Sequence, residues 1–294
     1  MQYEMTMLLG GVWYQLQQIA PYWVLGLLAG SLVSVYLSGG IAGKMTALTS
    51  GGAWFWPICA AALLGVVSPL CMYGTVPVIV ALGKKGVAQH FLAAFMISSV
   101  LLNPSLLIVT FALGTGLAMV RLFCAFFCGV LAGVLVRLCF SRKALFAFAR
   151  FGLPEDKAKK TFLHDLLKAF CITAPYLVIG VTLTALCDRY IPQEWIAGMF
   201  GGRRGLGVLF ATTLSIPLYA CGGGVIPLIG AWMRMGMGQG DALAFMLAGP
   251  ATKINNLSAV KMVFGLRNFC IYLAFCLGFA VVSGWVGGLI LSLV

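Results

Sequence analysis

Two segments of the sequence each place a cysteine ahead of a glycine and a proline. Residues 71–77 read CMYGTVP and residues 221–227 read CGGGVIP. A thiol is a ligand for soft cations and metalloids, and glycine and proline both interrupt an apolar helix. The spacing therefore predicts two bent segments that offer thiols and backbone polar groups to a solute. The candidate binding residues in these segments are Cys71, Tyr73, Gly74, Pro77, Cys221, Gly222, Gly223, Gly224 and Pro227.

These segments belong to an internal repeat. Residues 71–96 and 221–246 align without a gap and are identical at 10 of 26 positions. The heptapeptide APYWVLG at 20–26 also matches APYLVIG at 174–180 at five of seven positions. Chance similarity between apolar segments does not readily align Cys, Gly and Pro at one spacing. We therefore expect the chain to consist of two related halves.

The composition points to a membrane protein. Of 294 residues, 62% are hydrophobic and 9% are charged, whereas a soluble domain carries about 25% charged residues. The mean hydropathy is +1.03. These values exclude a soluble globular domain, a disordered chain and a secreted disulfide scaffold. The apolar runs are continuous, which favours helical spans of about 20 residues over alternating barrel strands, so we expect an all-α polytopic fold in the lipid bilayer.

The topology follows from the broken runs and the charges. A straight helix over 53–83 would be about 47 Å long, which exceeds the roughly 30 Å hydrocarbon core. We expect a broken re-entrant helical hairpin here and at 205–233, with about three full spans beside it in each half. Three crossings and one hairpin give inverted-topology repeats. The formal net charge is +12, and the positive-inside rule places the basic linker in the cytoplasm. The predicted domains are 1–139 (N-terminal repeat), 140–165 (basic cytoplasmic linker) and 166–294 (C-terminal repeat).

The span that follows each hairpin adds polar residues to the candidate site. The run FMISSVLLNPSLL places Asn103 in mid-span, and FMLAGPATKINNLS places Lys253 and Asn255 at the equivalent depth. Polar residues within a membrane are expensive and usually face a cavity or a partner helix. Lys253 has three alternative roles: a substrate contact, a charge whose exposure alternates during transport, or a residue that snorkels to the interface.

Other site chemistry is not expected. The sequence contains no HExxH, G-x-S-x-G or P-loop motif and no carboxylate pair inside a span. We therefore expect no catalytic residues and no cofactor, and whether the cysteines hold a metal stays open. His90 and His164 have no ligand spacing to each other and are expected at the surface.

At the repeated segments, the sequence resembles the predicted-permease family that includes the organoarsenical efflux permeases. The matching residues are the two Cys-x-x-Gly-x-x-Pro segments and AFMLAGPAT at 244–252. The family pattern has a second cysteine two residues after the first, where this chain has Tyr73 and Gly223. The resemblance covers about 20–110 and 174–265. It implies a permease fold and efflux of a trivalent organoarsenical or another soft, thiol-reactive species.

Three hypotheses follow for function. The first is a multi-pass secondary transporter of the bacterial inner membrane that exports a soft species or metal ion between the two Cys-Gly-Pro hairpins. The second keeps the fold but moves a small inorganic or organic anion, bound by Lys253, backbone amides and half-helix N-termini. The third is an intramembrane thiol enzyme. The expected partners are the bilayer and a small-molecule or ion substrate; no nucleic acid is expected, and a homodimer stays open.

Overall fold

The described part of the chain is helical. A computed structural model describes residues 10–13, 17, 24, 28, 54–70, 72–140, 145–146, 167, 170–171, 174, 178, 206–219, 225–234 and 236–293. None of these residues forms a strand. Among them, the helical segments Thr115–Cys139 and Phe264–Leu293 are long and apolar enough to cross a membrane. The segments Gln89–Leu101 and Leu106–Leu113 form a third candidate span, bent by 44°. The all-α prediction is therefore confirmed for the described part, and its apolar helices are compatible with a membrane protein.

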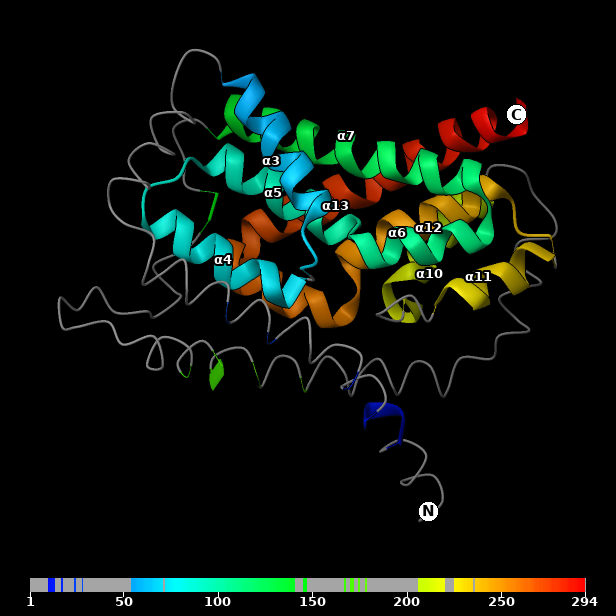
Figure 1. Cartoon of the computed structure of the whole chain (residues 1–294), viewed down its shortest axis with the longest axis horizontal. Helices are drawn as coiled ribbons and strands as arrows, with labels where there is room; N and C mark the ends of the chain where they lie inside the picture. The colour runs from blue at the N-terminus through cyan, green and yellow to red at the C-terminus, as the bar shows by residue number, and fades with distance from the viewer. Residues whose placement is uncertain are drawn as a thin grey trace.

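The helices fall into two series (Figure 1). The first consists of α3 (Phe55–Val67), α4 (Met72–Lys84), α5 (Gln89–Leu101), α6 (Pro104–Thr110), the 3-10 turn η1 (Phe111–Leu113) and α7 (Thr115–Cys139). The second consists of α10 (Leu206–Leu218), α11 (Val225–Arg234), α12 (Gln239–Thr252) and α13 (Ile254–Leu293). The helices α10 to α13 begin about 150 residues after α3 to α6, respectively.

The turns between these helices also occur in pairs. Gly86 and Gly236 have φ values of 85° and 109°, and each follows the second helix of its series. Gly114 has φ 129° and precedes α7, while Gly265 has φ 72° and divides α13 into two helices. Glycine adopts these left-handed conformations without the steric cost of a Cβ atom. The second part of α13 therefore begins at the position in its series where α7 begins in the first.

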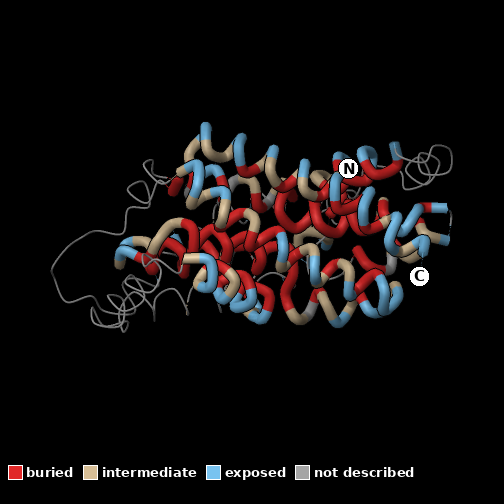
Figure 2. Tube along the Cα trace, turned by 90° about the horizontal axis from the view of Figure 1, so that it is seen from above, coloured by how far each residue is buried: buried red, intermediate tan, exposed pale blue. Residues whose placement is uncertain are grey.

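The surface of α7 is typical of a helix that faces lipid. Its exposed residues include Met119, Phe123, Phe127 and Leu138, at helical spacing. Its buried face carries small residues, including Gly129. Figure 2 shows the same pattern for the bundle as a whole, with buried residues along the centre and exposed residues on the outer turns. A wide exposed apolar surface marks contact with a membrane or a partner, and small inward residues let membrane helices approach closely.

Each series of helices contributes residues to the buried cluster of the other series. One buried cluster is built on α3, α4 and α5, and it includes Val260, Phe264 and Tyr272 from α13. A second cluster is built on α10, α11 and α12, and it includes Leu117 from α7 with Leu113 packed against it. Figure 1 shows part of this exchange, because the first part of α13 passes near α4. The turn η1 of the first series likewise contacts α11 of the second. Hydropathy and helical periodicity do not predict this exchange.

Candidate functional site

The predicted hairpin tips are only partly described. Cys71, Cys221 and residues 222–224 (Gly222, Gly223 and Gly224) lie outside the described residues, so the predicted juxtaposition of the two thiols stays a prediction. For Tyr73, Pro227 and Asn255 only the backbone is described, and it is helical in α4, α11 and α13, respectively. Gly74 and Pro77 are buried within α4.

The first hairpin break lies earlier than predicted. We expected Gly74 and Pro77 to interrupt the run, but both lie inside α4. The preceding helix α3 instead ends at Val67, and Ser68 is extended with φ −72° and ψ 134°. The reason is Pro69, because a proline disfavours the helical conformation of the residue before it. Thr75 then holds α4 against α5, since its hydroxyl lies 3.0 Å from the Ser99 hydroxyl.

Asn103 occupies the break in the first bent span. Helix α5 ends at Leu101, and α6 begins with Pro104, whose missing N–H costs nothing at the first helical position. The Asn103 side-chain oxygen accepts a hydrogen bond from the Leu106 N–H at 2.9 Å and so caps α6. The side chain is 8% exposed. The predicted polar residue in mid-span is therefore buried at a helix break.

Lys253 occupies the equivalent break between α12 and α13. Its backbone is non-helical, with φ −51° and ψ 139°, and its side chain is 1% exposed. A lysine that snorkels must bring its ammonium to the surface, so this burial does not fit the snorkelling alternative. Burying a lysine at the centre of a membrane helix costs about 2.5–3.5 kcal/mol on insertion scales. A lysine kept at such a cost is a candidate for a functional role.

The end of α12 is held by side chains from α13. The Asn256 amide donates to the Pro250 carbonyl, and the Tyr272 hydroxyl donates to the Ala251 carbonyl at 3.0 Å. The last carbonyls of a helix have no intrahelical donors, and lipid offers none. This break is therefore satisfied by protein, as a non-helical segment at membrane depth requires.

Arg121 is a buried polar residue that sequence reasoning missed. Its Nη1 donates to the Thr110 hydroxyl at 2.5 Å and lies 3.5 Å from the Met246 sulfur. Its Nη2 donates to the Met246 carbonyl at 3.3 Å. That carbonyl lacks its helical donor because Pro250, four residues later, has no N–H. The sequence does carry a signal, since Arg121 is the one charged residue between positions 112 and 136.

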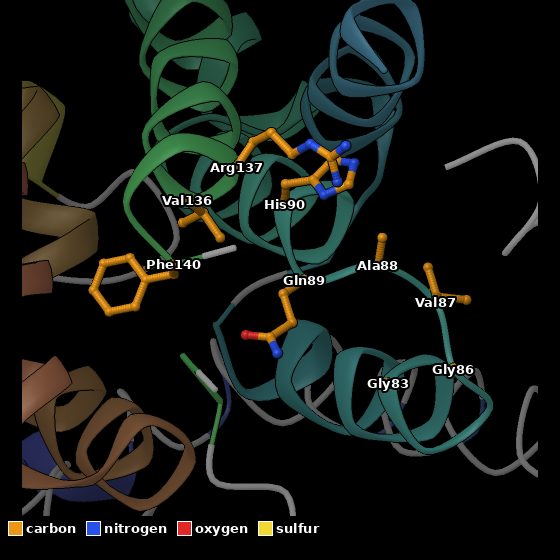
Figure 3. Close-up of a pocket in the computed structure, with 9 residues that line it drawn as sticks. All are labelled: Gly83, Gly86, Val87, Ala88, Gln89, His90, Val136, Arg137 and Phe140. Atoms are coloured by element: carbon orange, nitrogen blue, oxygen red, sulfur yellow. The ribbon is translucent and has the colours of Figure 1, made fainter. Parts of the chain in front are cut away.

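A cavity lies elsewhere in the bundle. It has a volume of about 370 Å³ and is lined by the loop between α4 and α5 and by the end of α7 (Figure 3). Helix α5 separates it from Asn103 by about 18 Å at 1.5 Å per residue. His90 and Arg137 lie side by side in its wall. His90 is 4% exposed, so its predicted surface location is wrong; it begins α5 where that helix packs against α7.

The described cysteines do not form a metal site. Cys128 and Cys276 are buried in the first cluster, and the described cysteines are free thiols. No group of three or more His, Cys, Asp or Glu residues in the described ranges could hold a metal ion. Buried thiols such as these two pack as small apolar residues in a helix interface.

Known proteins with similar sequences include a protein named as a membrane permease subunit and several UPF0718 proteins. A putative two-component membrane permease complex subunit of Streptococcus mutans is 25% identical over 83% of this chain and 82% of its own length. UPF0718 protein MJ0584 of Methanocaldococcus jannaschii is 30% identical over 47% of this chain, and the matched part spans 38% of that relative. UPF0718 protein YraQ of Escherichia coli is 31% identical over 30% of this chain and 25% of its own length. No solved structure matches the chain significantly.

The family match covers both halves. Residues 11–289 match the ArsP_1 family, which is described as a predicted permease. The match contains the helix breaks at Asn103 and Lys253 and the range 140–165 for which a linker is predicted. It also supports transport rather than enzymatic catalysis. The chain therefore belongs to the ArsP_1 family of predicted permeases.

Proposed function

We propose that the protein is a secondary transporter whose solute binds between the halves, near Asn103 and Lys253. The observation that carries this proposal is the burial of both polar side chains at equivalent helix breaks, 8% and 1% exposed, respectively. A polar residue at membrane depth marks a solute path by default. Broken helices at the interface of two repeats are also where secondary transporters bind their substrates.

The halves are proposed to be inverted repeats, over 1–139 and 166–294, joined by a cytoplasmic linker at 140–165. The paired helix bounds and paired glycine turns support two equivalent halves. An odd number of crossings would turn the second half over. The exchange of η1 and the first part of α13 then gives each hairpin a wall from the opposite half. Relative movement of the two hairpins would open the site to each side in turn.

For the solute, the first candidate is a soft, thiol-reactive species such as a trivalent organoarsenical or a metal ion, exported from the cytoplasm. This candidate rests on the family relation and on Cys71 and Cys221 at equivalent positions of the repeat. Tyr73, Gly74, Pro77, the glycines 222–224, Pro227 and Asn255 would shape the site. The third hypothesis, an intramembrane thiol enzyme, has no base near either cysteine in the sequence to activate the thiol.

The second candidate is a small inorganic or organic anion, and a separate observation favours it. Lys253 is a buried cation at the predicted site, and α11 begins directly after the predicted tip at 221–224 with an N-terminus that attracts negative charge. Replacing the cysteines would affect the two candidates differently, because an anion does not need a thiolate ligand.

The surroundings of the transporter are also proposals. We place it in the bacterial inner membrane, with the bilayer and a small solute as its partners. The streptococcal relative is named as a subunit of a two-component permease complex, so a second membrane subunit is a candidate partner, and a homodimer is the alternative.

The test is a resistance screen in an arsenic-sensitive bacterial strain. If the solute is the soft species, wild type should protect cells against a trivalent phenylarsenical, and Cys71→Ser with Cys221→Ser should abolish the protection at equal expression; an anion transporter should give no thiol-dependent protection. Cys139→Ser, at an exposed described thiol, is the matched control and should protect like wild type. If the double variant also protects fully, the thiol site is wrong.

A further inference from the structure

Among the residues that the structure describes, the buried cation Arg121 meets only neutral groups. The side chain is 0% exposed. Its acceptors are the Thr110 hydroxyl, the Met246 sulfur and the Met246 carbonyl. Within the described residues, Asp241 is the one acidic residue, and its carboxylate accepts from the Gly238 N–H and lies against Gly207 of α10. The positive charge of Arg121 is therefore left without a counter-charge from the described helices.

The guanidinium also has more N–H donors than it has acceptors among the described residues. It carries five N–H groups, of which two at Nη1 and one at Nη2 meet the acceptors just named. The Nε atom is buried and has no hydrogen-bond partner among the described residues. A buried donor without an acceptor is costly and calls for an explanation. The N–H at Nε and the second one at Nη2 form a fork of the kind that matches two oxygens of one oxyanion.

The position of Arg121 ties it to the proposed site. It projects from α7 of the first half and bonds Met246 of α12 in the second half. Met246 lies seven residues before Lys253, which is about 10 Å along the helix. Thr110, its other partner, ends the α6 helix that Asn103 begins. Two buried cations thus lie within about two helical turns of each other along α12.

We propose that the transported solute is a small oxyanion or carboxylate, and that Arg121 is one of its binding residues. This inference rests on the proposed function and names its substrate class. An anion would supply the missing counter-charge and acceptors, and its departure would leave the guanidinium on the neutral Met246 carbonyl. The same carbonyl, freed by Pro250, gives the arginine a resting partner between binding events.

The experiment uses purified full-length protein in proteoliposomes. Uptake of radiolabelled phosphate, sulfate, thiosulfate and acetate is measured beside that of the neutral phenylarsine oxide. The variants are Arg121→Lys, which keeps the charge, and Arg121→Gln, which keeps a polar side chain with N–H donors and loses the charge. Arg137→Gln is the matched control, because it removes an arginine from the same helix beside the separate cavity.

We expect uptake of at least one anion, reduced about tenfold or more in Arg121→Gln, because a desolvated charge partner is lost. Arg121→Lys should retain much of it, and Arg137→Gln should match wild type. Uptake of phenylarsine oxide alone, by every variant, would overturn the anion inference and leave the permease standing. Uptake of no probe would overturn both.

A second measurement covers variants that fail to fold. The unfolding temperature of wild type in detergent is followed by tryptophan fluorescence as phosphate or sulfate replaces chloride at constant ionic strength. An anion that binds the native state raises this temperature with its concentration. A saturable rise with any anion supports the inference, and identical curves in every salt contradict it.

Discussion

Lys253 ends α12 with a side chain that is 1% exposed, in a chain that exposes large apolar residues along its outer helices. The usual arrangement of a protein is thus reversed at this residue, because the charge lies inside and the apolar groups lie outside. Lipid accounts for the exposed apolar residues. A solute path accounts for the buried cation, since the cost of burying it is then offset by binding.

Neutralising Lys253 should therefore impair transport. We expect Lys253→Gln to lower uptake of the transported solute about tenfold or more in proteoliposomes, as loss of one buried charged contact typically does. The control is Lys261→Gln, eight residues later within α13 at an exposed position. If both variants transport like wild type, Lys253 is not a binding residue.

The carbonyls at the end of α12 make a separate prediction about stability. Tyr272→Phe removes the hydroxyl that donates to the Ala251 carbonyl at 3.0 Å. We expect the free energy of unfolding to fall by about 0.5–2 kcal/mol, because a buried acceptor loses its donor and membrane hydrogen bonds are of this order. Thermal unfolding in detergent measures the loss. An unchanged transition temperature would mean that water or another group replaces the hydroxyl.

A glycine on α13 allows this helix to pack closely against α12. A Cβ atom added at Gly284 would lie 2.9 Å from the Gly240 carbonyl oxygen and 2.8 Å from the Ala244 Cβ. A Cβ atom added at Gly278 would meet nothing within 4 Å. The two glycines therefore have different roles, one at the contact with α12 and one open to the surroundings.

The matched pair Gly284→Ala and Gly278→Ala tests this difference. We expect Gly284→Ala to destabilise the protein by about 1–3 kcal/mol, since overpacking forces α12 and α13 apart. Gly278→Ala should be neutral or slightly stabilising, because alanine favours the helix by up to about 1 kcal/mol over glycine. The yield of folded protein by size-exclusion chromatography and its unfolding temperature provide the readout. Equal behaviour of the two variants would contradict the packing.

The helices could be predicted from the sequence, but only some of the breaks between them could. Runs of apolar residues and the repeat identified the elements, and Pro104 marked the bend before α6. The break before α4 was predicted at Gly74 and Pro77 because both recur in the repeat. Pro69, where the helix actually breaks, has no proline counterpart at position 219. Arg121 was missed because it lies near the end of its apolar run, where a flanking cation is ordinary.

In the whole molecule, each of the two helix series packs into the buried cluster of the other. The first part of α13 completes the cluster around α4, and η1 contacts α11. Periodicity does not predict such an exchange, because the apolar pattern of a helix does not specify which helix it packs against. The repeat could be read from the sequence, but the way its halves interlock could not.

Inverted orientation of the halves has a direct consequence for labelling. Lys84 and Arg234 are exposed at the ends of α4 and α11, 150 residues apart. In a cysteine-less background, we expect Lys84→Cys to react with an impermeant thiol reagent only from the cytoplasmic side and Arg234→Cys only from the outer side. Labelling of both from one side would make the repeats parallel.

The most direct test of a solute path at the paired breaks is water access to single cysteines. Asn103→Cys and Lys253→Cys are made in the cysteine-less protein, with Phe123→Cys on the exposed apolar face of α7 as the lipid-facing control. The reagent is a small, charged methanethiosulfonate, applied to sealed vesicles of both orientations. We expect Asn103→Cys and Lys253→Cys to react from at least one side, while Phe123→Cys does not react. A solute path at the breaks is contradicted if both positions stay unreactive from either side in folded protein.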